Sequence, residues 1–290
     1  MRDFLFHLRH TVAAALDDNC FGIAKGAAYS ALVSFFPILA LAAAVLAQAG
    51  GSFASGTLEG WMYTIVPPGA ADLVVQQFRA AGKRPPGLLT VASLISLWAA
   101  SSVIKSLIEG FHAAYRVPRN RDFLHESALA VALALVSAAP LAAATVLVVF
   151  GGGVEQRVLA WMKVDPVLNP WSWLWQWLCH VARYGLALAA SVTVAACLLY
   201  FGPYRPQRWR YVWPGALLAA GLWLVTTMGF GWYVRNMAHY SATYGSVGAG
   251  IALLVWMYLL AAGALIGCEF NAVRERGDGS PRSQGLGARG

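Results

Sequence analysis

The sequence predicts an all-α integral membrane protein with six transmembrane helices, an N-terminal amphipathic helix and helical outer loops. Three observations lead to this fold class. Apolar residues make up 59% of the chain, and only 12% are charged, whereas a soluble domain carries about 25% charged residues. Several uncharged runs are also long enough to cross a bilayer, which takes about 20 residues in a helix. Lipid offers the backbone no hydrogen bonds, so such runs predict helices and not barrel strands.

The clearest spanning run is the last one, from Tyr240 to Cys268, which contains no Asp, Glu, Lys or Arg. Pro37 and Pro140 lie inside two earlier runs and predict kinks there. Gly151 to Gly153 are expected to end the third span. The six predicted spans cover, in chain order, about residues 26–49, 88–104, 127–150, 182–202, 211–234 and 240–268.

Three regions follow from this assignment. Residues 1–25 form an amphipathic helix, which lies along the membrane surface or packs under the bundle. Residues 26–272 form the transmembrane domain, and residues 273–290 are expected to be a disordered basic tail. The connection from 50 to 87 predicts two short helices, and a tryptophan-rich connection from 154 to 180 predicts an interfacial segment.

Lysine and arginine are distributed unequally between the two sets of connecting segments. The segments on the side of the termini carry 14 of the 21 basic residues, and the other set carries seven. Basic residues are enriched in cytoplasmic loops. The chain is therefore predicted to lie in a bacterial cytoplasmic (inner) membrane with both termini in the cytoplasm. The net charge of +8 is explained by the same rule, without a nucleic acid partner.

The sequence contains no pattern that is typical of a catalytic or metal centre. The four cysteines lie in or beside apolar segments, without Cys-x-x-Cys spacing, so we expect neither a disulfide framework nor a metal site. Zinc-protease, nucleophile-elbow and phosphate-loop motifs do not occur. We therefore expect a protein that is not an enzyme and has no cofactor.

Small residues at helical spacing predict close helix packing. Glycines four apart let two helix backbones approach each other in lipid. Such packing can lie within one chain or between two copies, so a homodimer is an open alternative. The glycines predicted to serve helix packing are Gly22, Gly26, Gly245, Gly248, Gly263 and Gly267.

Two polar residues follow the last span at once and are candidates for a substrate path. Glu269 and Asn271 stand where this span reaches its cytoplasmic end. A carboxylate at a membrane boundary can mark the route of an ion or substrate. The alternative is that Glu269 pairs with a basic residue and stabilises the helix end. This alternative is favoured, because a charge near a helix end costs less than a charge in the middle of the membrane.

Other polar residues near span ends are weaker candidates for the same path. Lys105, Glu109 and His112 share one helix face, which predicts a cytoplasmic gate or a solvated helix extension. Lys25 and Tyr29 lie at the entrance of the first span, where they could bind lipid phosphate or simply snorkel. Tyr244 lines a pocket or anchors the last span.

Four stretches together resemble the YihY/BrkB family of bacterial inner-membrane proteins. They are AAYSALVSFFPIL, WAASSVIKSLIEGFHAAY, YFGPYRPQRWRYVWPGALLAAGLW and YGSVGAGIALLVWMYLLAAGALIGCEFNA, and the resemblance covers about residues 10 to 275. It implies six spanning helices and a cytoplasmic-membrane location. Members have carried a ribonuclease BN label, widely regarded as a misassignment, and a virulence-factor label, and export of lipid-like or anionic molecules has been proposed. Cys268 and His112 stand where relatives often have Ala and Asn.

Three functions are compatible with these observations. The favoured hypothesis is a transporter or flippase-like exporter of an amphipathic or anionic substrate, with membrane lipids as partners. The alternative is a structural or accessory envelope protein that binds lipid or a partner and transports nothing. A membrane-bound ribonuclease is the third hypothesis, and it would need clustered acids or a histidine pair that the sequence does not bring together.

Overall fold

The computed structural model of the chain describes residues 2–49, 86–117, 123–161, 172–237 and 241–277. Within these ranges all regular structure is α-helical, which confirms the predicted fold class. The helices are α1 (Arg2–Asp17), α2 (Cys20–Ala49), α5 (Pro86–Tyr115), α6 (Phe123–Trp161), α7 (Ser172–Phe201), α8 (Trp209–Met237) and α9 (Ser241–Gly277).

Five of these helices are long and apolar enough to cross a membrane by length and composition. They are α5 to α9, and each contains a qualifying stretch of at least 21 residues. Helix α2 is 30 residues long and contains Pro37, and its described stretch Cys20–Phe35 is a shorter apolar helix. The first predicted span, residues 26–49, therefore lies within α2.

Several boundaries differ from the predicted ones. Helix α6 continues through Gly151 to Gly153 as far as Trp161, because in lipid an unbroken helix satisfies the backbone, which outweighs the low helix propensity of glycine. Helix α9 extends to Gly277, so residues 273–277 are helical. The two short helices predicted between 50 and 87 fall on residues outside the described ones, except that α5 begins at Pro86. The tail from residue 278 also lies outside the described residues.

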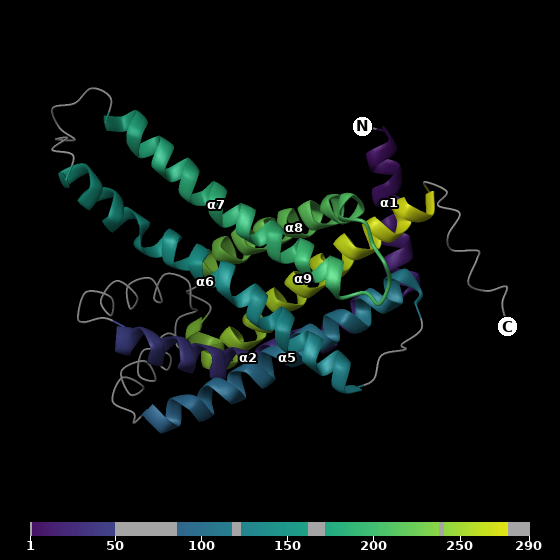
Figure 1. Cartoon of the computed structure of the whole chain (residues 1–290), viewed down its shortest axis with the longest axis horizontal. Helices are drawn as coiled ribbons and strands as arrows, with labels where there is room; N and C mark the ends of the chain where they lie inside the picture. The colour runs from purple at the N-terminus through teal and green to yellow at the C-terminus, as the bar shows by residue number, and fades with distance from the viewer. Residues whose placement is uncertain (1, 50–85, 118–122, 162–171, 238–240, 278–290) are drawn as a thin grey trace.

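The spanning helices pack in a closed order around the molecule. Helix α2 packs on α5, α5 on α6, α6 on α7, α7 on α8, α8 on α9, and α9 returns to α2. Helix α9 also contacts α5 and α1. It therefore touches four other helices, and its position sets the position of the rest (Figure 1).

Among the residues whose side chains are described, the buried ones lie toward one end of the bundle, which we call the closed end. Successive spans run in opposite directions, and the buried stretches alternate between the first and the second part of each helix. Many of the buried residues are alanines, whose small size permits close packing. The stretches are 20–34 in α2, 96–114 in α5, 126–137 in α6, 192–199 in α7, 212–220 in α8 and 257–272 in α9.

Toward the other end, the helices separate. Large apolar side chains are exposed there, including Leu186 (60%) and Met228 (65%), as they also are at the lipid-facing surface of the closed end, for example Leu124 (79%). Figure 1 shows the α6–α7 hairpin and the α2–α5 pair diverging toward the left, away from α1 and the C-terminal end of α9. The bundle is thus packed at the closed end and splayed at the opposite end.

Helices α2 and α5 are joined near Pro37 by serine hydroxyls. The Ser96 hydroxyl donates to the Pro37 carbonyl at 2.8 Å. The Ser34 hydroxyl lies 2.7 Å from the Ala99 carbonyl and 2.6 Å from the carbonyl of Ser30. In lipid, such hydroxyls supply hydrogen bonds near a proline, which itself has no N–H.

The closest approach between helices is the crossing of α8 and α9. A Cβ added at Gly267 would lie 2.5 Å from the Gly215 carbonyl oxygen and 2.8 Å from Ala219 Cβ. One turn before, a Cβ at Gly263 would lie 3.3 Å from Leu222 Cβ. The Trp223 indole N–H also donates to the Leu260 carbonyl at 2.7 Å. This crossing depends on the absence of side chains at Gly215 and Gly267.

The two helical glycines Gly267 and Gly26 should respond in opposite ways to alanine. G267A should lower the free energy of unfolding by roughly 1–3 kcal/mol, because the new methyl group overlaps α8. G26A should leave stability unchanged or raise it by up to about 1 kcal/mol, because a Cβ there meets no described atom within 4 Å. Thermal unfolding in detergent compares the two variants. Equal melting of G267A and wild type would contradict the close crossing.

Candidate functional site

The closed end is bounded by charged side chains, and the first of them comes from the C-terminus of α5. Arg116 has a left-handed backbone, with φ 54°. Its N–H donates to Ala113 O at 3.0 Å, and the Val117 N–H donates to His112 O at 3.0 Å. This pair of bonds is a Schellman cap, which glycine usually completes. The Ala114 carbonyl accepts neither of these two hydrogen bonds.

The Arg116 side chain pairs with the turn between α1 and α2. Asn19, with φ 53°, separates the two helices and presents Asp18. The Arg116 Nε donates to Asp18 Oδ1 at 3.1 Å and lies 3.4 Å from Oδ2. The Asp18 side chain is 12% exposed and that of Arg116 is 60% exposed, so solvent screens the pair and limits its contribution to stability.

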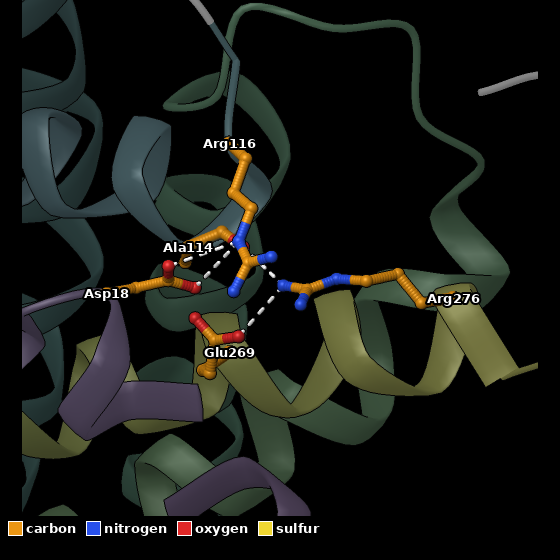
Figure 2. Close-up of polar contacts among 5 residues, drawn as sticks. All are labelled: Asp18, Ala114, Arg116, Glu269 and Arg276. Atoms are coloured by element: carbon orange, nitrogen blue, oxygen red, sulfur yellow. Dashed lines mark hydrogen bonds and ion pairs between the residues drawn. The ribbon is translucent and has the colours of Figure 1, made fainter. Parts of the chain in front are cut away.

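Glu269 on α9 is the most deeply buried charged residue described, with an exposed fraction of 0%. Arg276, two turns further along α9, donates from Nη2 to Glu269 Oε1 at 2.9 Å. The same nitrogen donates to the Ala114 carbonyl at 2.6 Å (Figure 2). Arg276 therefore joins the buried carboxylate of α9 to the C-terminus of α5, where a cation is also favoured by the helix dipole.

The second oxygen of Glu269 is in a different situation. Glu269 Oε2 is buried and has no hydrogen-bond partner in the part of the chain that the structure describes. A buried carboxylate oxygen without a donor is costly. The site therefore holds one oxygen of this carboxylate firmly and leaves the other available.

The connection between α7 and α8 closes the same end from the other side. Arg205 forms an ion pair with Glu275 of α9, and its guanidinium lies over the Tyr115 ring, 4.3 Å from the centroid. The His112 Nε2 accepts the backbone N–H of Tyr204 at 3.3 Å. The connection is thus held to both α5 and α9 by polar contacts.

Asn271 lies beside this cluster, where it holds α9 to α8. Its Oδ1 accepts the Gly215 N–H at 2.7 Å, and its Nδ2 donates to the Val212 carbonyl at 3.0 Å. Both partners lie next to Pro214 inside α8. A proline lacks an N–H and disturbs the hydrogen bonds of the preceding turn. The geometry therefore gives Asn271 a structural role at the helix crossing.

The remaining sequence candidates are dispersed. His112 is buried at 5%, whereas Glu109 on the same helix is exposed and Lys105 is half-buried, so the three do not share one environment. Lys25 is exposed, and Tyr29 is 67% exposed. The side chain of Tyr244 lies outside the described residues.

The predicted packing glycines also differ from one another. Gly263 and Gly267 lie against α8, and Gly22 lies under the Asn19 side chain. Gly26 has no close neighbour among the described residues. Gly245 and Gly248 are part of α9, and the described contacts do not show what they pack against.

Five charged residues of the cluster were missed as site candidates. Arg276 was recoverable in principle, because it stands seven residues after Glu269 and so returns to nearly the same helix face. The others come from turns and helix ends, where a solvated charge is the ordinary expectation. The missed residues are Asp18, Arg116, Arg205, Glu275 and Arg276.

The described residues contain no group of three or more His, Cys, Asp or Glu side chains placed to hold a metal ion. The four cysteines are not joined in disulfides. Cys20 and Cys268 are buried at the closed end, and Cys179 and Cys197 are half-buried. What the arrangement offers chemically is a set of reversible ion pairs around one buried carboxylate.

Comparison with known proteins gives one family and several relatives. The family model described as Virulence factor BrkB matches residues 11–288. The ribonuclease-like protein YfkH of Bacillus subtilis (strain 168) is 28% identical over 248 residues, 85% of this chain and 86% of the relative. A UPF0761 membrane protein of Xanthomonas campestris pv. campestris (strain B100) is 29% identical over 262 residues, 88% of this chain. This chain spans only 57% of the Xanthomonas relative. No solved structure matches.

The Glu269–Arg276 pair should show strong coupling in a double-mutant comparison. R276M should lower the free energy of unfolding by on the order of 2 kcal/mol, because it leaves a buried carboxylate without its donor. The double variant R276M/E269Q should recover part of that loss, since the buried charge is removed as well. Thermal unfolding in detergent measures both, with R274M on the same helical turn as the matched control. Equal melting of R276M and R274M would show that the pair contributes nothing to stability.

Proposed function

This chain belongs to the BrkB family of membrane proteins, and from that premise we propose that it carries an anionic amphipathic molecule, such as a phospholipid, across the membrane. We place it in a bacterial inner membrane with the closed end and both termini on the cytoplasmic side. The distribution of basic residues, 14 on this side and seven on the other, supports that orientation.

The observation that carries this proposal is the unequal packing along the bundle. Helices that are packed at one end and splayed at the other resemble one state of a carrier that opens alternately to the two sides. Ion pairs and hydrogen bonds join the helix ends at the closed end, beside a buried apolar cluster that includes Phe111 and Leu265. Such contacts can break and re-form at modest energetic cost when water enters.

A cation in the splayed part of the bundle supports an anionic substrate. Arg183 lies within the apolar stretch Trp177–Phe201 of α7, on the splayed side of the buried stretch that begins at Val192. Its Nε is buried without a hydrogen-bond partner in the described part of the chain. An arginine inside a spanning segment is costly and usually marks a functional position. An anionic headgroup would complement this charge, while the exposed apolar side chains nearby suit an acyl chain.

Transport is tested with the purified chain in vesicles of phosphatidylethanolamine and phosphatidylglycerol that contain fluorescent phosphatidylglycerol. We expect lipid movement between leaflets, measured by quenching with dithionite, to exceed that of protein-free vesicles. Movement equal to that of protein-free vesicles would overturn the lipid-carrier proposal and favour an accessory protein that transports nothing.

The closed end should have to open during transport. In a chain whose four native cysteines are replaced by alanine, Y115C/R205C places two thiols on α5 and on the α7–α8 connection, whose native side chains are in contact. A short, cleavable bifunctional thiol reagent should abolish lipid movement, and reductant should restore it. R205C alone, treated identically, is the control. Unchanged movement after complete cross-linking would exclude opening between these elements.

A further inference from the structure

We propose that Glu269 is a proton-binding site, and that binding of a proton at Oε2 unlocks the closed end. This inference deepens the proposed transport function. It rests on that function only in one respect, which is that the proton would be the coupling ion. Proton binding itself is a property of the folded chain and can be measured without any substrate.

The geometry of the carboxylate carries the proposal. Glu269 has no exposed surface, one oxygen is bound by Arg276 at 2.9 Å, and the other is buried without a partner in the described residues. Burial disfavours a charged carboxylate, and the bond to Arg276 favours it. A group held between opposing influences of this kind can change its protonation state when its surroundings change.

The charged and titratable groups in electrostatic contact with Glu269 come from the α1–α2 turn, from α2, from α5 and from α9 itself. Asp18 of the α1–α2 turn favours proton uptake, whereas Arg116 of α5 and Arg276 of α9 oppose it. Glu275 and Arg205 form an ion pair with each other, so their charges largely cancel at Glu269. The other titratable groups in electrostatic contact with the carboxylate are Cys20, Tyr115 and Cys268. In Figure 2, the Asp18 and Glu269 carboxylates lie on the same side of the two guanidinium groups.

A proton suits this site better than a metal cation. A hard cation takes several oxygen ligands, six to eight in the case of calcium, but only one oxygen of Glu269 is free of hydrogen bonds. Two guanidinium groups nearby also repel a cation. A proton needs a single lone pair and is taken up from water at the closed end.

Protonation has a direct structural consequence. An O–H bond forms at Oε2, the negative charge of Glu269 is lost, and Arg276 keeps only a neutral acceptor at Oε1. The Arg276 side chain is 43% exposed, so its guanidinium can turn to water and release the Ala114 carbonyl. The hydrogen-bonded link between α9 and the C-terminus of α5 is then lost, which favours opening of the closed end.

The native cysteines can report this opening. Cys20 and Cys268 are buried at the closed end and should be shielded from a maleimide while it is shut, whereas Cys179 is half-buried in the splayed part of α7. Acid slows thiol alkylation at every cysteine, because the thiolate is the reactive species. We therefore measure, by mass spectrometry, the labelling of Cys20 and Cys268 relative to Cys179 in nanodiscs between pH 8 and pH 5.

The expected result is that this ratio rises as the pH falls in the wild-type chain. E269Q, which mimics the neutral acid, should give a high ratio at all pH values. E126Q is the matched control, because Glu126 is also a buried carboxylate, 5% exposed, and this variant should keep the wild-type response. A wild-type ratio that does not rise on acidification overturns the proposal even if E269Q fails to fold. A rise that persists unchanged in folded E269Q overturns it as well.

Two further conditions separate the alternatives. If replacing potassium by sodium at constant pH raises the ratio, the ligand is a metal cation and the proton assignment is wrong. The lipid-movement assay tests the transport proposal separately. A pH-dependent labelling ratio in a chain that moves no lipid would retain the proton site and reject the carrier, whereas lipid movement with a flat ratio would retain the carrier and reject the proton site.

Discussion

The crossing of α8 and α9 is the contact on which the rest of the bundle depends. At Gly215 and Gly267 the two backbones lie closer than any side chain would permit, and the Asn271 amide bonds the α8 backbone on both sides of Pro214. Lipid offers no hydrophobic driving force between helices, so close packing and hydrogen bonds must hold them together. Since α9 also contacts α1, α2 and α5, this crossing fixes the axis around which the other helices are placed.

Much of the fold follows from the sequence because its physical cause is local. A run without charge must form a helix if it enters lipid, and the runs ending near Ile104, Phe201 and Cys268 were therefore recognisable. The same constraint explains why α6 passes through Gly151 to Gly153. Local propensity predicted a break there, but an open backbone in lipid is more costly than a glycine within a helix.

The candidate site was only partly accessible to such reasoning. Glu269 and Asn271 stood out because polar residues directly after a long apolar run are unusual. Their partners did not stand out, because whether Asp18 or Arg116 meets another charge is decided by how α1, α2 and α5 pack, and periodicity contains no information about that packing. Arg116 shows the difficulty well: a left-handed residue that ends a helix is ordinarily glycine, so the sequence gives no sign that α5 ends there with an arginine turned toward Asp18.

The splayed half of the bundle makes the surrounding lipid a component of the conformational equilibrium. At the closed end the described helices enclose a buried core, and in the other half large apolar side chains such as Leu94 and Met228 are exposed and are solvated by acyl chains. Lateral pressure and hydrophobic thickness in that leaflet therefore act on the angle between the α2–α5 pair and the α6–α7 hairpin. The two leaflets therefore differ in what they contact: one surrounds the closed end, and the other, through its acyl-chain length and packing, acts on the splayed helices.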